Sequence, residues 1–177
     1  MMKIVIAIAA VAALTVVATA AVLAIGMSDV MSSTATESEL LMPAGNVAGQ
    51  ALVVYTPGLT GEAKNKAAQV AGDLKAKGYE VTLAGVKSEA AGDYAGCEVI
   101  VVGAPVYLIG HGAIQTYLQA LDPPEGARVG IFATGSRNPD PFPDTAWLDA
   151  TVQLPAGEDH DRLLAGFVAG LLGQAET

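Results

Sequence analysis

The sequence predicts an α/β domain in which a parallel sheet lies between two layers of helices, a three-layer αβα sandwich. Short runs of apolar, often β-branched residues alternate with longer segments whose apolar residues recur at helical spacing. Loops rich in Gly, Pro and Thr follow several of the strand-like runs, and this alternation of strand and helix is typical of a parallel sheet. The pattern begins at residue 51, so we expect the domain to occupy residues 51–177.

The first strand and helix are the clearest elements. Residues 51–55, ALVVY, form an unbroken apolar run of the kind found in fully buried parallel strands. The loop TPGLTG separates this run from a helix with apolar residues on one face and lysines on the other, closed by Gly78. The residues of the apolar face are Ala63, Ala67, Val70, Ala71 and Leu74.

Three more strands and a second helix follow. Residues 80–86 are predicted as the second strand, residues 99–102 as a central third strand because they are wholly apolar, and residues 128–134 as the fourth. The helix between the third and fourth strands ends before Pro123 and Pro124. Its apolar face is formed by Ile114, Tyr117, Leu118 and Leu121.

The last part of the chain is less regular. Residues 136–144 contain three prolines and are predicted as a loop. Residues 151–154 are predicted as a short fifth strand. Residues 159–173 form an amphipathic helix, and the acidic residues at its start complement the helix dipole.

The N-terminal 26 residues are predicted to be a transmembrane or signal-anchor segment. Residues 4–26 carry no charge and would extend about 34 Å as a helix, enough to cross a bilayer. Ala18-Thr19-Ala20 also fits a signal-peptide cleavage site, but the apolar run continues to Ile25, which favours an uncleaved anchor. Lys3 then places the N-terminus inside and the domain outside the cytoplasm, as a single-pass membrane protein.

Residues 27–50 are predicted to be a flexible linker, because they mix Ser, Thr, Glu, Gly and Pro without a sustained period. The expected organisation is therefore a membrane segment at 1–26, a linker at 27–50 and a domain at 51–177. Deleting the membrane segment should release a soluble, folded domain.

Charge excludes one class of partner. The net charge is −9, from 18 acidic and 9 basic residues, and no basic stripe is present for nucleic acid to bind. The acidic surface fits ordinary solubility or docking to a basic partner. Cys97 is the only cysteine, so no disulfide can form within the chain, and its apolar neighbours predict a buried, unreactive thiol.

Ligands of parallel sheets bind beyond the carboxyl ends of the strands. Three loops occupy that position, at 56–61, 103–112 and 135–144. The first precedes a helix N-terminus, where free N–H groups attract anions, and its glycines let the backbone approach a phosphate. Thr56 and Thr60 add hydroxyl donors, although Thr60 fits equally well as the N-cap of its helix.

Three segments in this order resemble the flavodoxin family. LVVYTPGLTGEAKNKA is similar to the family's first strand, phosphate loop and helix. VIVVGAPVYLIGHGAIQTYL is similar to the third strand and the loop that flanks the flavin, and VGIFATGSRNPD to the next strand and the second flavin-contacting loop. The resemblance covers Ala51 to about Leu172 and implies a five-stranded parallel sheet of order 2-1-3-4-5 with noncovalently bound flavin mononucleotide (FMN) for electron transfer.

The resemblance also implies which residues would bind FMN. The phosphate would be held by Thr56, Gly58, Thr60 and Gly61. Pro105, Val106 and Tyr107 would border the isoalloxazine ring, with Tyr107 either stacking on it or packing on its own loop. Gly135, Ser136 and Arg137 would line the opposite rim.

Two features depart from the family pattern. Pro57 removes one backbone N–H from the phosphate loop, and Glu62-Ala63 replace the expected Asn-Thr, so that a carboxylate at Glu62 would repel a phosphate unless it points away. The helix that normally joins the last two strands is shortened to the region around Trp147.

No catalytic residue or metal site is predicted. His111 and His160 are expected to be solvated surface residues, and no Ser-His-Asp set, carboxylate pair or metal-ligand spacing is present.

Three functions remain as alternatives, and a homodimer is compatible with each of them. The first is a membrane-tethered electron-transfer protein that binds FMN and meets a redox partner protein. The second is a binding or scaffold module of the same fold without flavin. The third is a small NAD(P)H-dependent quinone or flavin reductase. Whether the protein is an enzyme depends on which of these holds.

Overall fold

The computed structural model describes residues 35–109, 111–136 and 142–173. Within these ranges no helix combines the length and the apolar character needed to cross a membrane. The predicted membrane segment at 4–26 lies outside the described residues.

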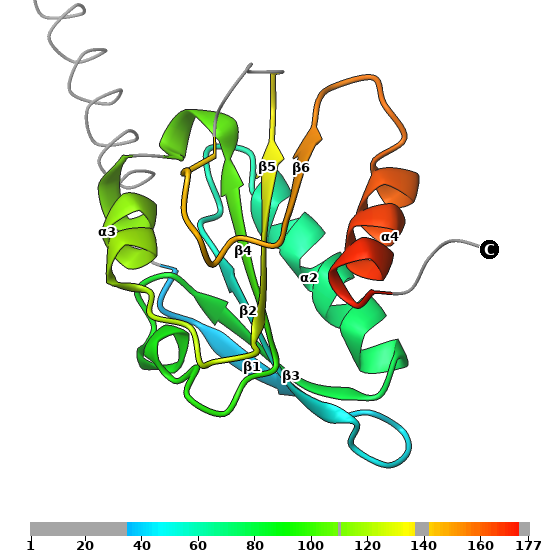
Figure 1. Ribbon diagram of the computed structural model, residues 1–177. Coiled ribbons are helices and arrows are strands. Elements are labelled where there is room, and N and C mark those ends of the chain that lie inside the picture. The colour runs from blue at the N-terminus through cyan, green and yellow to red at the C-terminus, as the bar shows by residue number, and fades with distance from the viewer. Residues whose placement is uncertain (1–34, 110, 137–141, 174–177) are drawn as a thin grey trace, which may run out of the picture. The chain divides into compact units, whose positions relative to one another are not determined.

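A mixed sheet of six strands forms the centre of the described domain (Figure 1). Its strand order is β1-β3-β2-β4-β5-β6, and all neighbours from β3 to β6 pair in parallel. These five parallel strands confirm the predicted order 2-1-3-4-5. The strands are β1 (Ser38–Leu41), β2 (Gly49–Tyr55), β3 (Tyr79–Gly85), β4 (Val99–Pro105), β5 (Arg128–Thr134) and β6 (Ala150–Leu154).

Strand β1 shows that the predicted linker boundary was wrong. The strand lies within residues 27–50, which the sequence assigned to a flexible linker, and it pairs antiparallel with β3 at the edge of the sheet. Strand β2 also begins at Gly49, inside the same range. No apolar period marks β1 because it has only four residues, three of them exposed.

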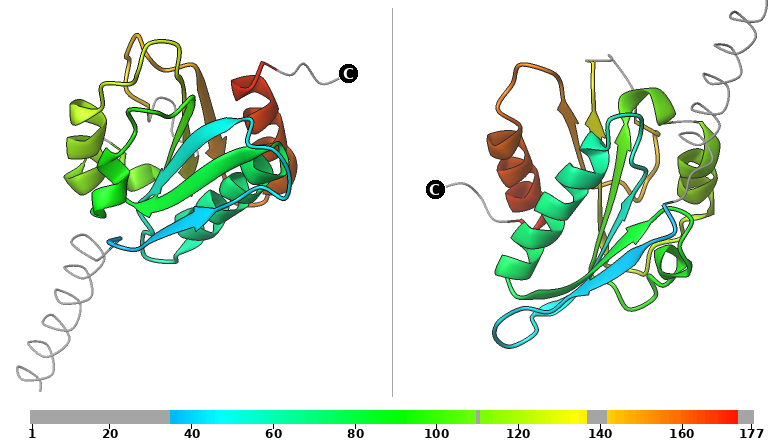
Figure 2. Two further views of the ribbon diagram at one scale, coloured as in Figure 1. Left: turned by 90° about the horizontal axis from the view of Figure 1, so that it is seen from below. Right: turned by 180° about the vertical axis from the view of Figure 1, so that it is seen from behind.

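The helices cover both faces of the sheet, as predicted. Helices α2 (Glu62–Ala76) and α4 (His160–Leu171) pack side by side on one face, and α3 (Gly112–Ala120) lies on the other (Figure 2). Two short 3₁₀ helices, η1 (Glu89–Gly92) and η2 (Val106–Leu108), lie before and after β4.

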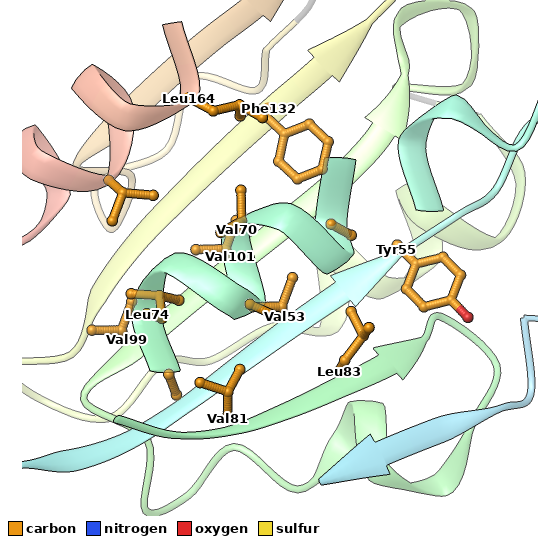
Figure 3. Close-up of a cluster of buried hydrophobic side chains, with 14 of the residues drawn as sticks. Val53, Tyr55, Val70, Leu74, Val81, Leu83, Val99, Val101, Phe132 and Leu164 are labelled. Atoms are coloured by element: carbon orange, nitrogen blue, oxygen red, sulfur yellow. The ribbon is translucent and has the colours of Figure 1, made fainter. Parts of the chain in front are cut away.

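Each face of the sheet has its own apolar core. Alternate residues of β2 point to opposite faces, so that Val53 packs under α2 and α4 while Leu52 and Val54 pack toward α3. Figure 3 shows the first cluster, in which Val70 of α2 and Leu164 of α4 cover the sheet. Burial on both faces explains why the sequences of the central strands β2, β4 and β5 are almost continuously apolar.

The connection between β5 and β6 differs from the shortened helix expected around Trp147. The described part of this connection, residues 142–149, contains only turns and extended backbone. Phe142, Trp147 and Leu148 pack against the core on the α3 side and take the place of a helix. The Asp149 carboxylate accepts a hydrogen bond from the N–H of Val129 at 2.7 Å and fixes the end of this connection to the start of β5.

Candidate functional site

The sheet register brings the three predicted loops to one edge. Tyr55 at the end of β2 pairs with Gly103 of β4, and Pro105 at the end of β4 pairs with Thr134 at the end of β5. The loops that follow are in contact: a side chain at Gly58 would strike the Pro105 ring, and one at Gly135 would lie 3.4 Å from Val106. The structure therefore assembles the predicted site at the carboxyl ends of β2, β4 and β5.

Thr56 is the most informative residue of the first loop. It is 8% exposed, and its N–H donates to the carbonyl of Gly103 at 3.0 Å, which extends the pairing of β2 with β4. Its hydroxyl oxygen Oγ1 is buried and has no hydrogen-bond partner among the described residues. An unpaired buried hydroxyl costs about 1–3 kcal/mol, and the hydroxyls of Tyr117 and Thr145 are buried without a partner in the same way.

Gly58 sets the shape of this loop. Its φ of +68° lies in the left-handed region that favours glycine. A Cβ at this position would also lie 3.1 Å from the Tyr107 hydroxyl, in addition to striking Pro105. A side chain here would push the first loop away from the second, so glycine is required for their close approach.

The N-terminus of α2 is open. Its N-cap is Gly61, with φ +70°, which has no side chain to cap the helix. Thr60 is therefore not the N-cap; it is exposed, and its hydroxyl accepts a hydrogen bond from the N–H of Glu62 at 3.4 Å. The first N–H groups of an α-helix lack partners within the helix and attract anions. The buried Thr56 hydroxyl and this open helix end belong to one short loop.

The Glu62 carboxylate is directed toward α4. Its Oε1 lies 3.5 Å from Nδ1 of His160, the first residue of α4. The other ring nitrogen of His160 lies 2.8 Å from the carbonyl oxygen of Pro155 and donates to it, since a carbonyl can only accept. The side chain of His160 is 16% exposed, so its predicted surface position was wrong. The Glu62 carboxylate thus lies on the side of its helix that faces α4.

Tyr107 links the first two loops through a contact that the sequence did not predict. Its hydroxyl accepts a hydrogen bond from the N–H of Leu59 at 3.1 Å, across 48 residues of sequence. Tyr107 is 49% exposed and Leu59 is 64% exposed, so both present apolar surface at this edge. No local pattern could have revealed the bond, because it depends on the tertiary approach of Gly58 to Pro105.

The third loop is described only in part. Gly135 has φ +114°, and its N–H donates to the carbonyl of Leu154 at 3.2 Å. Ser136 is exposed, and Arg137 lies outside the described residues. His111 is exposed as expected and forms the N-cap of α3.

No family model and no curated protein matches this chain. Solved structures of flavodoxins are similar to it. A flavodoxin from Streptococcus pneumonia TIGR4 has 18% identity and a TM-score of 0.53, over 71% of this chain and 99% of that one. A short-chain flavodoxin associated with a non-canonical PDU bacterial microcompartment has 24% identity and a TM-score of 0.54, over 72% of this chain and 99% of that one. The chain has a flavodoxin-like fold.

The described residues contain no group of metal ligands and no reactive cysteine beside the candidate site. No group of three or more His, Cys, Asp or Glu side chains that could hold a metal ion occurs in them. Cys97 is buried as expected, and burial raises the pKa of its thiol to about 11. A thiol with this pKa is protonated at neutral pH and is a poor nucleophile.

Proposed function

We propose that the protein binds FMN at the carboxyl edge of its sheet and transfers electrons. The observation that carries this proposal is the unpartnered Thr56 hydroxyl, buried in a loop that ends at the open N-terminus of α2. A phosphate would supply the missing hydrogen-bond partner and would be stabilised by the helix dipole. The two solved structures described above are both flavodoxins, which supports the proposal.

The first loop would bind the phosphate of FMN, and the other two loops would border its ring. Thr56 and Thr60 would donate hydroxyl hydrogen bonds to the phosphate, and Gly58 and Gly61 would allow the backbone to approach it. FMN, when bound, supplies the electron-accepting ring, and the protein orients that ring and limits its contact with water. The border of the ring would be formed by Pro105, Val106, Tyr107, Gly135, Ser136 and Arg137.

A binding module without flavin is the second candidate, and two observations favour it. Pro57 has no N–H to offer, and the N–H of Leu59 already donates to Tyr107. Two of the backbone donors that the first loop would otherwise present to a phosphate are therefore absent or occupied.

We also propose that residues 4–26 tether the domain to a membrane, with the domain outside the cytoplasm. The length and apolar character of this stretch support the tether, and Lys3 supports the orientation. The net charge of −9 suits a redox partner with a basic surface.

The test of FMN binding is a fluorescence titration of the full chain in detergent, with Thr56→Val as the variant. The wild type should quench added FMN. Thr56→Val should weaken binding about 10- to 100-fold, because a hydrogen bond to a charged group contributes about 1.5–3 kcal/mol. The same change should leave the stability of the flavin-free protein unchanged or raised, because it replaces an unpaired buried hydroxyl with a methyl group.

Thr116→Val is the matched control, since this exposed threonine lies on α3 and bonds only to its own helix, at the carbonyl of Gly112. Its FMN affinity should equal that of the wild type. A folded wild-type protein that quenches no FMN would contradict the electron-transfer proposal and leave the binding module as the function.

A further inference from the structure

A contact between Glu62 and His160 joins the first residues of two neighbouring helices. Helices α2 and α4 lie side by side, and both begin at the carboxyl edge of the sheet (Figure 1). Glu62 is the first residue of α2, and His160 is the first residue of α4. The contact therefore lies at the end of α2 that forms part of the candidate site.

The two ring nitrogens of His160 have different partners. Nε2 lies 2.8 Å from the carbonyl oxygen of Pro155, which can only accept, so Nε2 carries a proton. Nδ1 lies 3.5 Å from Oε1 of Glu62. A neutral ring with its proton on Nε2 presents a lone pair at Nδ1, which cannot bond to an ionised carboxylate, whereas a protonated ring presents a second N–H. Loss of the second proton would therefore break the contact with Glu62.

Several other charged groups lie on the elements next to His160. They are Lys66 of α2, Asp161 of α4, and Glu158 and Asp159 before the start of α4. The Asp161 carboxylate interacts with the charge of His160, and it also accepts hydrogen bonds from Lys66 and Gln69. Asp159 caps α4 by accepting a hydrogen bond from the N–H of Arg162 at 3.1 Å. Glu62 is the carboxylate that pairs with the ring across the two helices.

A carboxylate and a phosphate compete for the open end of α2. The unpaired N–H groups and the helix dipole favour negative charge at this end, whichever group carries it. Glu62 is the acidic residue of the first turn, and its N-cap neighbour Gly61 has no side chain. The Glu62 side chain is 40% exposed, so it has room to change direction once its partner is lost. A Glu62 carboxylate released from His160 would compete with a bound phosphate and repel it.

We propose that His160 is a positioning residue for FMN binding: its protonated ring holds the Glu62 carboxylate against α4, and loss of the proton releases that carboxylate. This inference rests on the FMN site proposed above. The phosphate of FMN then contributes most to binding when His160 is protonated. Its contribution falls as the pH rises through the range, about pH 5 to 8, in which histidine side chains lose their charge.

The test compares two ligands at two pH values, with the full chain in detergent. Riboflavin lacks the phosphate of FMN, so the ratio of the two affinities isolates the contribution of the phosphate. Fluorescence titrations at about pH 5.5 and about pH 8 measure both affinities. Glu62→Gln should raise the ratio about three- to tenfold at the higher pH and less than about twofold at the lower pH. Comparing variants at one pH cancels the titration of the FMN phosphate itself.

His160→Gln supplies the second comparison. Alone, it should lower the ratio about three- to tenfold at the lower pH, because glutamine cannot carry the charge that holds Glu62. Combined with Glu62→Gln, it should have no effect at either pH, since His160 acts through the carboxylate. A merely structural role of His160 would lower the ratio in both backgrounds. Glu89→Gln, the same charge change on η1, is the matched control and should leave the ratio unchanged.

Two results would overturn the inference and leave FMN binding itself intact. The first is a Glu62→Gln variant with the wild-type ratio at both pH values. The second is an effect of His160→Gln that persists without the Glu62 carboxylate. A folded wild-type protein that binds neither flavin would overturn the FMN site and this inference together.

Discussion

Tyr107 connects the two loops of the candidate site with one hydroxyl group, and this bond can be removed without losing the ring. Tyr107→Phe deletes the acceptor for the N–H of Leu59 but keeps the aromatic surface. We expect FMN affinity to stay within about threefold of the wild type or to rise, because the freed N–H can serve the phosphate and one neutral hydrogen bond contributes only about 0.5–1.5 kcal/mol.

Tyr107→Ala is the companion variant, and it should bind FMN at least about tenfold more weakly, because it removes the ring that borders the flavin. Equal affinities for the Phe and Ala variants would show that the ring takes no part in binding. Both affinities can be measured by the same fluorescence titration.

At the residue scale, the sequence predicted the parts of the site that depend on local chemistry. Gly58 and Gly61 are where a tight loop before a helix requires glycine, and both have positive φ. Thr56 was predicted as a phosphate donor; its hydroxyl is buried without a partner among the described residues, and the donation itself stays a prediction. The contacts of Tyr107 with Leu59 and of His160 with Glu62 could not be predicted, because each joins residues far apart in the sequence.

At the element scale, a polar cluster ties α2 to α4. Nζ of Lys66 and Nε2 of Gln69, both on α2, donate to Oδ1 of Asp161 on α4, each at 3.1 Å. The hydrogen bonds from Lys66 and Gln69 hold the pKa of Asp161 below its ordinary value of 3.8. A lowered pKa in the folded state stabilises the fold above the ordinary pKa, and this stabilisation is lost as the pH falls through the lowered value.

Asp161→Asn should therefore lower the melting temperature slightly at neutral pH, with a difference from the wild type that disappears as the pH falls below about 3.8. Because Asp161 is exposed, the effect will be small. Thermal unfolding followed by circular dichroism across this range measures it. Glu89→Gln on η1, an exposed site with the same charge change, is the control. A difference that stays constant with pH would contradict the assignment to the Asp161 carboxylate.

Elements with a strong apolar period were predicted and those without one were not. Helices α2 and α4 each bury one apolar stripe, which is visible in the sequence. Strand β1 exposes most of its residues and gains its order from pairing with β3, so its sequence resembles a linker. The turns before Asp149 hold their place through scattered apolar contacts, which no periodicity reveals.

At the scale of the whole molecule, β1 marks where the domain can be cut. A fragment of residues 34–177 retains every described strand and should be soluble and monomeric. A fragment of residues 45–177 lacks β1 and leaves the edge of β3 unpaired beside Val81 and Leu83, so it should self-associate. The lost burial of Ala35 and Leu41, about 2 kcal/mol, should lower its melting temperature by roughly 5–10 °C.

Size-exclusion chromatography and thermal unfolding of the two fragments test this prediction. Equal melting temperatures and equal elution would show that β1 adds nothing to the fold. The order of the parallel strands was predictable, because the central strands β2, β4 and β5 are buried on both faces and their sequences are almost continuously apolar. The antiparallel β1 was not predictable, because it is short and exposes most of its residues.

The turn around Trp147, in the described part of the connection between β5 and β6, also gives the molecule an internal optical reporter. Trp147 is the only tryptophan in the chain, and it lies half-buried against the apolar core on the α3 face. Its emission therefore reports on the packing of this turn against the core on the α3 face. Loosening of this turn and general unfolding would both change the wavelength and the intensity of the Trp147 emission. Unfolding of the protein can therefore be monitored in solution without an added dye.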